Sequence, residues 1–168
     1  MATRTEWFPL VNEAGETIGK ATRQECHNGS KPLHPVVHLH IFNRAGDLFL
    51  QKRSMSKDIQ PGKWDTAVGG HIDYGESVEE ALRREAREEL GIRDFTPSLI
   101  KRYVFESNVE KELVHSFRTV YEGPFTIDPE ELDEGRFWSI EEIKASLGKG
   151  ILTPNFEKEY INLFGGEK

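Results

Sequence analysis

The stretch Gly70-His-Ile-Asp-Tyr-Gly-Glu-Ser-Val-Glu-Glu-Ala-Leu-Arg-Arg-Glu-Ala-Arg-Glu-Glu-Leu-Gly-Ile92 is the most informative part of the chain, because it predicts a tight loop followed by an amphipathic helix. The glycines at 70 and 75 permit a tight turn. Ser77, with Glu80 three residues later, has the sequence of a capping box. At about 100° per residue, the apolar side chains of a helix over 77–90 gather on one side. They are Val78, Ala81, Leu82, Ala86 and Leu90.

Three glutamates occupy unusual positions on this helix. Glu85 and Glu89 fall inside the apolar arc, and Glu88 falls on its edge. A buried carboxylate costs several kcal/mol unless it is paired or binds a metal. Since carboxylates at i, i+3 and i+4 share one surface, they repel until a divalent cation neutralises them, and oxygen ligands suit Mg²⁺ or Mn²⁺. The competing interpretation is a solvated, salt-bridged helix face, which we expect for Glu79, Glu80 and the arginines at 83, 84 and 87.

The same stretch resembles the Nudix box, whose pattern is G-x5-E-x7-R-E-U-x-E-E-x-G-U, with U an apolar residue. The residues that fit are Gly70, Glu76, Arg84, Glu85, Ala86, Glu88, Glu89, Gly91 and Ile92. The resemblance implies a Nudix-type α/β/α sandwich with a mixed central sheet. It also implies Mg²⁺-dependent hydrolysis of a diphosphate linkage in a nucleotide or another nucleoside-diphosphate-type substrate.

Carried over residue by residue, the resemblance gives each box residue an expected role. Glu85, Glu88 and Glu89 would hold Mg²⁺ or Mn²⁺, with the carbonyl of Gly70 as a further ligand. Arg84 would orient the glutamates, and Glu76 would support the junction between loop and helix. Either Glu88 or Glu112 would be the general base, and the sequence does not choose between them.

Segments outside the box resemble the isopentenyl-diphosphate isomerase branch of the same superfamily, over roughly residues 8–145. They are 11–13, Gly15, 18–19, Arg23, 33–34, 42–43, Gly46, 51–54, Lys57, 61–65 and 70–71. That branch holds a second metal with histidines and glutamates. The matching positions here are His27, His34, His71, Glu110 and Glu112.

One position departs from the isomerase branch. The isomerases carry a catalytic cysteine just before the glycine that opens the box, and this chain has Gly69 there. Isomerising an unactivated double bond needs a proton donor and a proton acceptor on opposite faces of the substrate, and glycine offers neither. A diphosphate hydrolase is therefore the preferred hypothesis. An isomerase-like enzyme and a non-catalytic diphosphate-binding module are the alternatives.

Further candidates for substrate binding are the basic residues of one loop and several histidine and aromatic side chains. Arg53, Lys57 and Lys63 are expected to bind the diphosphate, although Lys52 and Lys63 fit an ordinary surface loop equally well. His38 and His40 alternate on one strand, which favours a partly exposed sheet face over a metal chelate. Four aromatic residues suit packing better than stacking on a base or prenyl group. They are Trp64, Tyr103, Phe105 and Trp138.

Composition bounds the class of protein. A chain of 168 residues suits one domain over 1–168, with an N-terminal hairpin extension over 1–33, a core over 34–148 and a C-terminal helix over 149–168. A formal net charge of −7 argues against a nucleic-acid polymer as partner. One cysteine excludes an internal disulfide and suits the cytoplasm. No apolar run approaches the ~20 residues of a membrane span. The expected partner is a small-molecule diphosphate, and a homodimer is left open.

The remaining pattern predicts mostly strands. We expect a hairpin of strands at 6–11 and 16–22, a short helical turn at 23–30, strands at 35–42 and 48–52, and a loop at 54–63. Residues 64–68 lead into the box, and 95–107 and 113–121 form an antiparallel pair. Ser139 caps a helix through 147, and a terminal helix covers 154–164.

Overall fold

The computed structural model describes residues 5–56 and 60–165 of the chain. In chain order its first elements are β1 (Trp7–Val11), β2 (Thr17–Thr22), α1 (Arg23–Cys26), β3 (Leu33–Phe42), β4 (Leu48–Arg53), β5 (Trp64–Thr66) and β6 (Val68–His71). They are followed by α2 (Val78–Leu90), β7 (Ser98–Glu106), β8 (Lys111–Val120), β9 (Leu132–Trp138), α3 (Ile140–Ser146) and α4 (Pro154–Leu163).

The central sheet is built around β3. This strand pairs in parallel with β8 along its whole length, from Leu33 opposite Lys111 to Phe42 opposite Val120. Its other edge pairs antiparallel with β6 near its start and with β4 at its end. The full order is β5-β4-β3-β8-β7, with β6 beside β3 and β9 beside β4. The sheet therefore mixes parallel and antiparallel pairs, as the sequence led us to expect.

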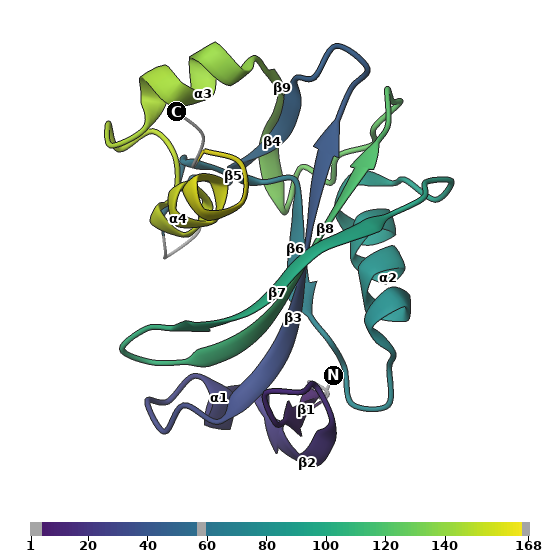
Figure 1. The fold of residues 1–168 in the computed structure, drawn as a ribbon, viewed down its shortest axis with the longest axis vertical. Helices are drawn as coiled ribbons and strands as arrows, with labels where there is room; N and C mark the ends of the chain where they lie inside the picture. The colour runs from purple at the N-terminus through teal and green to yellow at the C-terminus, as the bar shows by residue number, and fades with distance from the viewer. Residues whose placement is uncertain (1–4, 57–59, 166–168) are drawn as a thin grey trace.

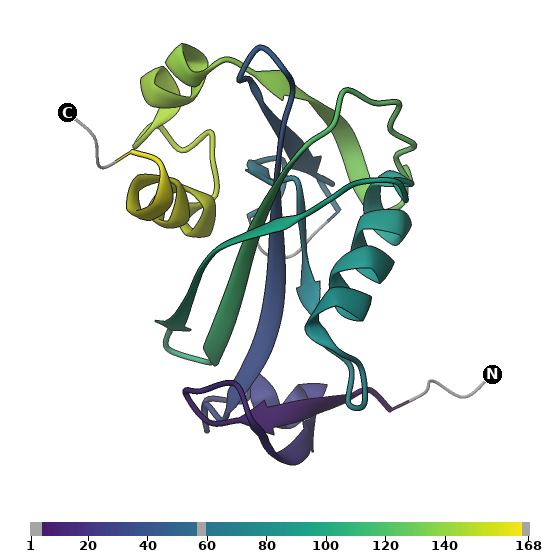
Figure 2. The same cartoon turned by 45° about the vertical axis from the view of Figure 1, so that its right-hand side comes forward.

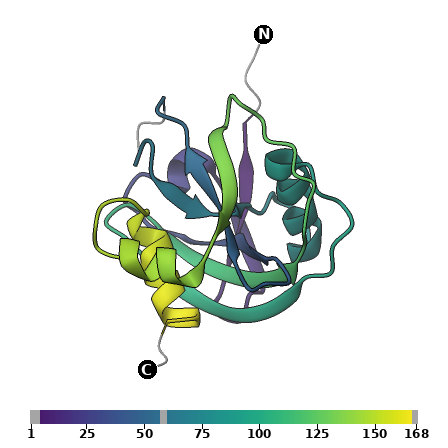
Figure 3. The ribbon, with the colours of Figure 1, turned by 90° about the horizontal axis from the view of Figure 1, so that it is seen from above.

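Helices cover both faces of this sheet (Figures 1 and 3). Helix α2 packs on one face, and α3 and α4 pack on the other. The hairpin of β1 and β2 lies across one end of β3, next to the loop that leads into α2 (Figure 2). The expected α/β/α sandwich with a mixed sheet is confirmed.

The alternation along β3 divides the core in two. Val37, Leu39 and Ile41 face α2 and join its buried residues Leu82 and Ala86 in one cluster. Phe42 belongs to a second cluster, which α3 and α4 complete with Ile143, Phe156 and Tyr160. Successive residues of a strand point to opposite faces, so the same strand serves both layers. His38 and His40 therefore face α4.

The box helix begins and ends where its sequence indicates. The Ser77 hydroxyl accepts a hydrogen bond from the Glu80 amide, and the Glu80 carboxylate accepts one from the Ser77 amide at 2.8 Å. At the other end Gly91 has a φ of 69°, a left-handed conformation that glycine adopts at low cost. Local chemistry therefore sets both ends of α2.

Strand β9 is the main correction to the expected elements. Residues 132–138 include acidic residues and a glycine and lack a clear alternation, so no strand was predicted there. In the structure they pair antiparallel with β4. A Cβ atom at Gly135 would lie 2.6 Å from the Phe49 ring, so the glycine is what lets the strand approach. Tertiary pairing, rather than local propensity, makes this strand.

None of the helices in the described residues is long and apolar enough to cross a membrane.

Candidate active site

Two acidic side chains of α2 point inward, toward β6. Glu85 keeps 15% of its side chain exposed, whereas Glu88 keeps 55%. Glu89 accepts hydrogen bonds from Gln51 Nε2 at 3.0 Å and from the Gly69 amide. Burial, together with each carboxylate's proximity to the other acidic groups, raises the pKa of Glu85 and raises that of Glu89 further. The expected positions of all three glutamates on the helix are confirmed.

Gly70 makes this close packing possible. A Cβ atom on Gly70 would lie 2.2 Å from the Glu85 carboxyl group. Any side chain at residue 70 would therefore displace Glu85 or push α2 off the sheet. The structure thus brings the Gly70 backbone against the carboxylate cluster.

Arg84 is the one box residue for which helix periodicity was wrong. We expected its side chain on the wet face, but only 21% of it is exposed and it turns back toward the loop. It donates to Glu76 through Nε at 2.7 Å and Nη2 at 2.9 Å, to Glu85 Oε2 at 3.0 Å and to the His71 carbonyl at 3.0 Å. The hydrogen bonds to Glu76 are the main cause of its raised pKa. A long side chain that snorkels around a helix escapes a simple wheel projection.

Glu76 ties the loop to the helix. Although burial opposes the effect, hydrogen bonds from Arg84 and the Asp73 amide lower the pKa of Glu76. The carboxylate therefore stays charged and grips both the arginine and the loop backbone, whose Asp73 amide donates at 2.9 Å.

The residues present fit a divalent cation. Burial raises the pKa of both largely buried carboxyl groups, and a neighbouring carboxylate adds to this, Glu88 for Glu85 and Glu85 for Glu89. A hard cation removes the repulsion between carboxylates and accepts carboxylate and carbonyl oxygens as ligands. The oxygens of Glu85 and Glu89 beside Gly70 are the donor set that Mg²⁺ or Mn²⁺ prefers.

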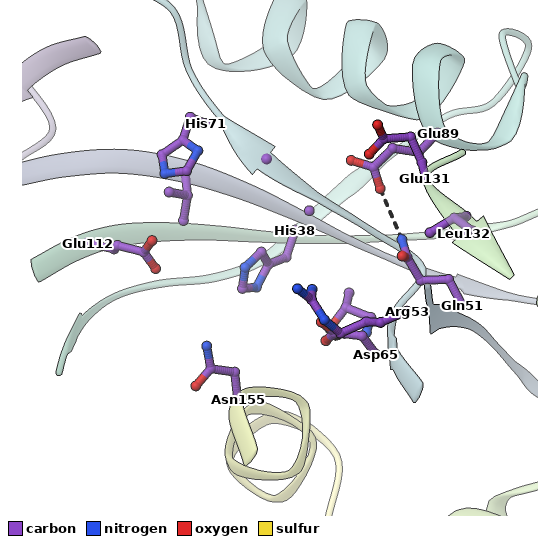
Figure 4. Close-up of a pocket in the computed structure, with 14 residues that line it drawn as sticks. His38, Gln51, Arg53, Asp65, His71, Glu89, Glu112, Glu131, Leu132 and Asn155 are labelled. Carbon is purple, nitrogen blue, oxygen red and sulfur yellow. Dashed lines mark hydrogen bonds and ion pairs between the residues drawn. The ribbon is translucent and has the colours of Figure 1, made fainter. Parts of the chain in front are cut away.

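A cavity of about 300 Å³ opens from this cluster toward α4 (Figure 4). Of the residues to which the sequence gave a role or a departure, it contains Arg53, Gly69, Gly70, His71, Glu89 and Glu112. Lys63 is not among its lining residues, and Lys57 lies outside the described residues. Six lining residues, which come from three strands, a loop and a helix, had no predicted chemical role. They are His38, Gln51, Asp65, Thr66, Glu131 and Asn155.

A histidine cluster lies on the other side of β6. The ligand atoms of His27, His34, His71 and Glu110 all lie within 4.8 Å of one another. His27 Nε2 is 2.8 Å from Glu110 Oε1, and His34 Nε2 is 3.8 Å from the same oxygen. The parallel register of β3 and β8, which sets His34 opposite Glu112, carries Glu110 to this place.

The imidazoles of this cluster have the form that a metal requires. His34 Nδ1 lies 3.0 Å from the Pro32 carbonyl, which can only accept, so its Nε2 carries the lone pair. Burial lowers the pKa of His34 and lowers that of His71 to about 2, so both are neutral. No hydrogen bond from the described residues reaches their Nε2 atoms, although both atoms are buried. Phe8 stacks on His71 with the ring centres 4.5 Å apart. These four residues therefore fit a transition metal.

Glu112 lies beside this cluster and is not part of it. The mutually close ligand atoms include Glu110 but not Glu112, which lines the cavity instead. Burial and the neighbouring Glu110 raise the pKa of Glu112 to about 8. The residue expected as a fifth ligand therefore lies outside the cluster and lines the cavity.

His38 and His40 correct a second expectation. The expected partly exposed sheet face is wrong for His40, which is 1% exposed beneath α4, whereas His38 keeps 22% of its side chain exposed. Both contact the buried carboxylate of Glu159, His38 through Nδ1 at 2.8 Å and His40 through Nε2 at 2.5 Å. The sequence gave no sign of this contact, because Glu159 is one of several polar residues in the terminal helix.

Of the four aromatic candidates, two lie in the core and two line a cavity. Trp64 and Trp138 pack against each other in the second core cluster, with ring centres 5.2 Å apart. Tyr103 and Phe105 line a smaller cavity of about 250 Å³ that shares His38, Glu112 and Asn155 with the first. His115, which had no predicted role, is buried in β8.

Comparison with known proteins supports the assignment suggested by the box. The NUDIX domain family matches residues 32–156. An uncharacterized Nudix hydrolase of Yersinia pestis is 34% identical over 165 residues, covering 92% of this chain and 90% of its own length. Another from Listeria monocytogenes is 34% identical over 153 residues, covering 90% of this chain and 89% of its own.

Solved structures share the fold. The protein DR0079 of Deinococcus radiodurans superposes with a TM-score of 0.80 at 24% identity, covering 95% of this chain and 99% of its own. A MutT protein of Methanosarcina mazei superposes with a TM-score of 0.67 at 28% identity, covering 82% and 96%. With the box glutamates gathered at Gly70 and the family matching most of its length, the chain belongs to the Nudix family of hydrolases.

Proposed function

We propose that this protein is a Mg²⁺- or Mn²⁺-dependent hydrolase of a diphosphate linkage in a nucleotide or a related small molecule. The observation that carries the proposal is the pair of buried carboxyl groups, Glu85 and Glu89, packed against Gly70 with raised pKa values. Such a pair is costly in the apo protein, and a bound cation removes the cost.

The cation would be held by Glu85, Glu88, Glu89 and the Gly70 carbonyl. When bound, it neutralises phosphate charge and lowers the pKa of water. Arg84 orients Glu85 through its 3.0 Å hydrogen bond while Glu76 fixes the arginine. Arg84 is therefore a positioning residue, which acts through the carboxylates.

The protein's own residues would move the proton. A carboxylate, Glu88 or Glu112, takes a proton from water as the water oxygen attacks phosphorus and the bridging P–O bond breaks. Glu88 is exposed and close to Arg84, whereas Glu112 lines the cavity with a pKa of about 8. Arg53, which lines the cavity, would bind the outer phosphate oxygens, and we propose the same role for Lys57 and for Lys63, although Lys63 is not among the lining residues.

We further propose a second metal at His27, His34, His71 and Glu110, with Glu112 as an additional ligand from the adjoining cavity. The support is the 4.8 Å cluster and its two buried imidazole nitrogens that lack hydrogen bonds from the described residues. This cluster is also what favours the second candidate function, an isopentenyl-diphosphate isomerase-like enzyme.

Gly69 separates the two candidates. A Cβ atom there would lie 3.4 Å from the His38 ring, so a small side chain fits with a slight shift. Gly69→Cys would restore the thiol of the isomerase branch. We expect the natural protein to leave isopentenyl diphosphate unchanged. Isomerisation by the natural protein would show that another residue replaces the thiol, and it would reverse the order of the two candidates.

The test of the hydrolase is a substrate panel with Mg²⁺, read by mass. The panel contains nucleoside di- and triphosphates, nucleotide sugars, dinucleotides and isopentenyl diphosphate. We expect hydrolysis of at least one member and a loss of about a thousandfold or more in kcat for Glu89→Gln. Normal turnover by the variant would contradict the metal site. Ligand-induced thermal stabilisation without any turnover would instead support the diphosphate-binding module.

Three wider proposals accompany this function. We propose that 1–168 acts as one domain, with the hairpin of 1–33, a core of 34–148 and the helix of 149–168. Because Cys26 is a buried free thiol, we propose a cytoplasmic location. We propose a homodimer as the alternative to a monomer, to be decided by light scattering.

A further inference from the structure

Glu159 of α4 is a buried carboxylate in the middle of four donors. Its side chain is 1% exposed. It accepts hydrogen bonds from His38 Nδ1 at 2.8 Å, His40 Nε2 at 2.5 Å, Ser116 Oγ at 2.5 Å and the Tyr103 hydroxyl. Four donors spread its negative charge, so His38 does not neutralise it alone. If Glu159 served only to hold α4 on the sheet, these hydrogen bonds would be sufficient.

A structural role alone does not explain the position of His38. Its side chain is 22% exposed, and its ring lines the cavity that also contains Gly70 and Glu89. Figure 4 shows the ring between Arg53 and Glu112, above Asn155. Since Nδ1 donates to Glu159, Nε2 lies on the other side of the ring, and no hydrogen bond from the described residues reaches it.

Gly69 is what keeps this edge of the ring uncovered. His38 and Gly69 are register partners on β3 and β6. A Cβ atom at residue 69 would lie 3.4 Å from His38 Cδ2 and 3.9 Å from Nε2. A larger residue would therefore lie over the nitrogen, whereas glycine leaves it open to the cavity.

We propose that His38 is a substrate-binding residue, which donates its Nε2 hydrogen to a non-bridging oxygen of the substrate's diphosphate, and that Glu159 fixes the ring in that orientation. The inference rests on the proposed function, because it takes a diphosphate as the substrate. A hydrogen bond from a cationic donor to a phosphate oxygen is among the stronger kinds in proteins.

The charges around the cavity agree with this role. Although burial acts against it, Glu159 raises the pKa of His38 to about 9, so the ring is a cation at neutral pH. Asp65 lies 3.7 Å from Arg53 Nη1 and accepts a hydrogen bond from Thr153 Oγ1 at 3.0 Å. Glu89 is a proposed cation ligand. Two of the four acidic residues that line the cavity, Asp65 and Glu89, are thus engaged by other partners.

The test measures binding of methylenediphosphonate, which cannot be hydrolysed, in the presence of Mg²⁺. We compare the natural protein with His38→Gln, Glu159→Gln and the matched control His40→Gln by calorimetry. His40 donates to the same carboxylate but is 1% exposed and does not line the cavity. It therefore reports the loss of one Glu159 donor without the loss of a ligand contact.

We expect Kd to rise about tenfold for His38→Gln, about threefold for Glu159→Gln and less than about twofold for His40→Gln. With a hydrolysable substrate, KM rises in parallel while kcat changes little. Thermal melting shows that each variant folds. Equal effects of His38→Gln and His40→Gln, or no binding of the diphosphonate by the natural protein, would overturn the proposal. Binding that depends on His38 without any hydrolysis would uphold it while the proposed function failed.

Discussion

The carboxylate site on α2 and the histidine cluster beneath the hairpin lie on either side of β6, and they are built in opposite ways. Glu85, Glu88 and Glu89 come from two turns of one helix, and Gly70 comes from the strand just before it. The residues of the histidine cluster come from the C-terminal cap of α1, from β3 and β6, and from the β7–β8 turn. One site is encoded locally, whereas the other exists only once the sheet and hairpin have assembled.

Their chemistry differs in the same sense. Oxygen ligands alone select a hard cation, while three imidazoles and one carboxylate suit a transition metal. The two proposed sites are therefore expected to prefer different cations. The two sites are expected to respond independently to substitutions, because one depends on α2 and the other on pairing between β3 and β8.

The largest effect is expected from Gly70→Ala, which should disturb the carboxylate site on α2 and leave the histidine cluster unchanged. The new Cβ would lie 2.2 Å from Glu85 and move it. We expect kcat to fall about a thousandfold, since misplaced ligands lose both position and charge stabilisation. Steady-state kinetics with Mg²⁺ measures this change.

Gly69→Ala is the matched control for that substitution, because its Cβ has 3.4 Å of room. It should keep kcat and raise KM no more than His38→Gln does. Equal losses of kcat in both glycine variants would show that the strand, rather than the Glu85 contact, is the sensitive element.

The next effect is expected at the histidine cluster. His34→Gln should weaken Mn²⁺ or Zn²⁺ binding at this site about a hundredfold and leave Mg²⁺ binding at the box unchanged. His115→Gln, another buried histidine outside the cluster, should change neither. Metal content after dialysis distinguishes them. Loss of both metals in His34→Gln would mean that the two sites are coupled.

The pH dependence of stability tests the interaction between His38 of β3 and Glu159 of α4. The folded-state pKa of His38, about 9, exceeds its ordinary value of 6.5, so its contribution is complete below about pH 6.5 and is lost as the pH rises through about 9. The free energy of unfolding should therefore fall by about 2 kcal/mol from pH 7 to pH 9, relative to His38→Gln. Urea unfolding without divalent cations measures it. Parallel curves for the two proteins would contradict the His38–Glu159 interaction.

The smallest effect is expected at the start of the box helix. Ser77→Ala removes the side-chain acceptor for the Glu80 amide and should cost about 1 kcal/mol. It should slightly weaken Mg²⁺ binding and leave the histidine cluster intact. Thermal unfolding with and without each metal would detect any cross-effect.

Local sequence was enough to predict the box helix, its caps and the inward position of Glu85 and Glu89. These features depend on residues at most a few turns apart, so helical periodicity and capping chemistry were enough. The resemblance to the Nudix box then predicted the α/β/α sandwich. Arg84 is the exception within this segment, because a flexible side chain takes the direction of its partner Glu76 rather than that of its Cα position.

Tertiary structure decided everything that depends on strand register. It made β9 a strand through Gly135 and Phe49, carried Glu110 to the histidines, and placed Glu159 against His38 from 121 residues away. Sequence spacing carries no information about such distances, since register and helix docking follow from packing of the whole core. The local pattern therefore predicted the box helix, and only the assembled sheet revealed which residues face it.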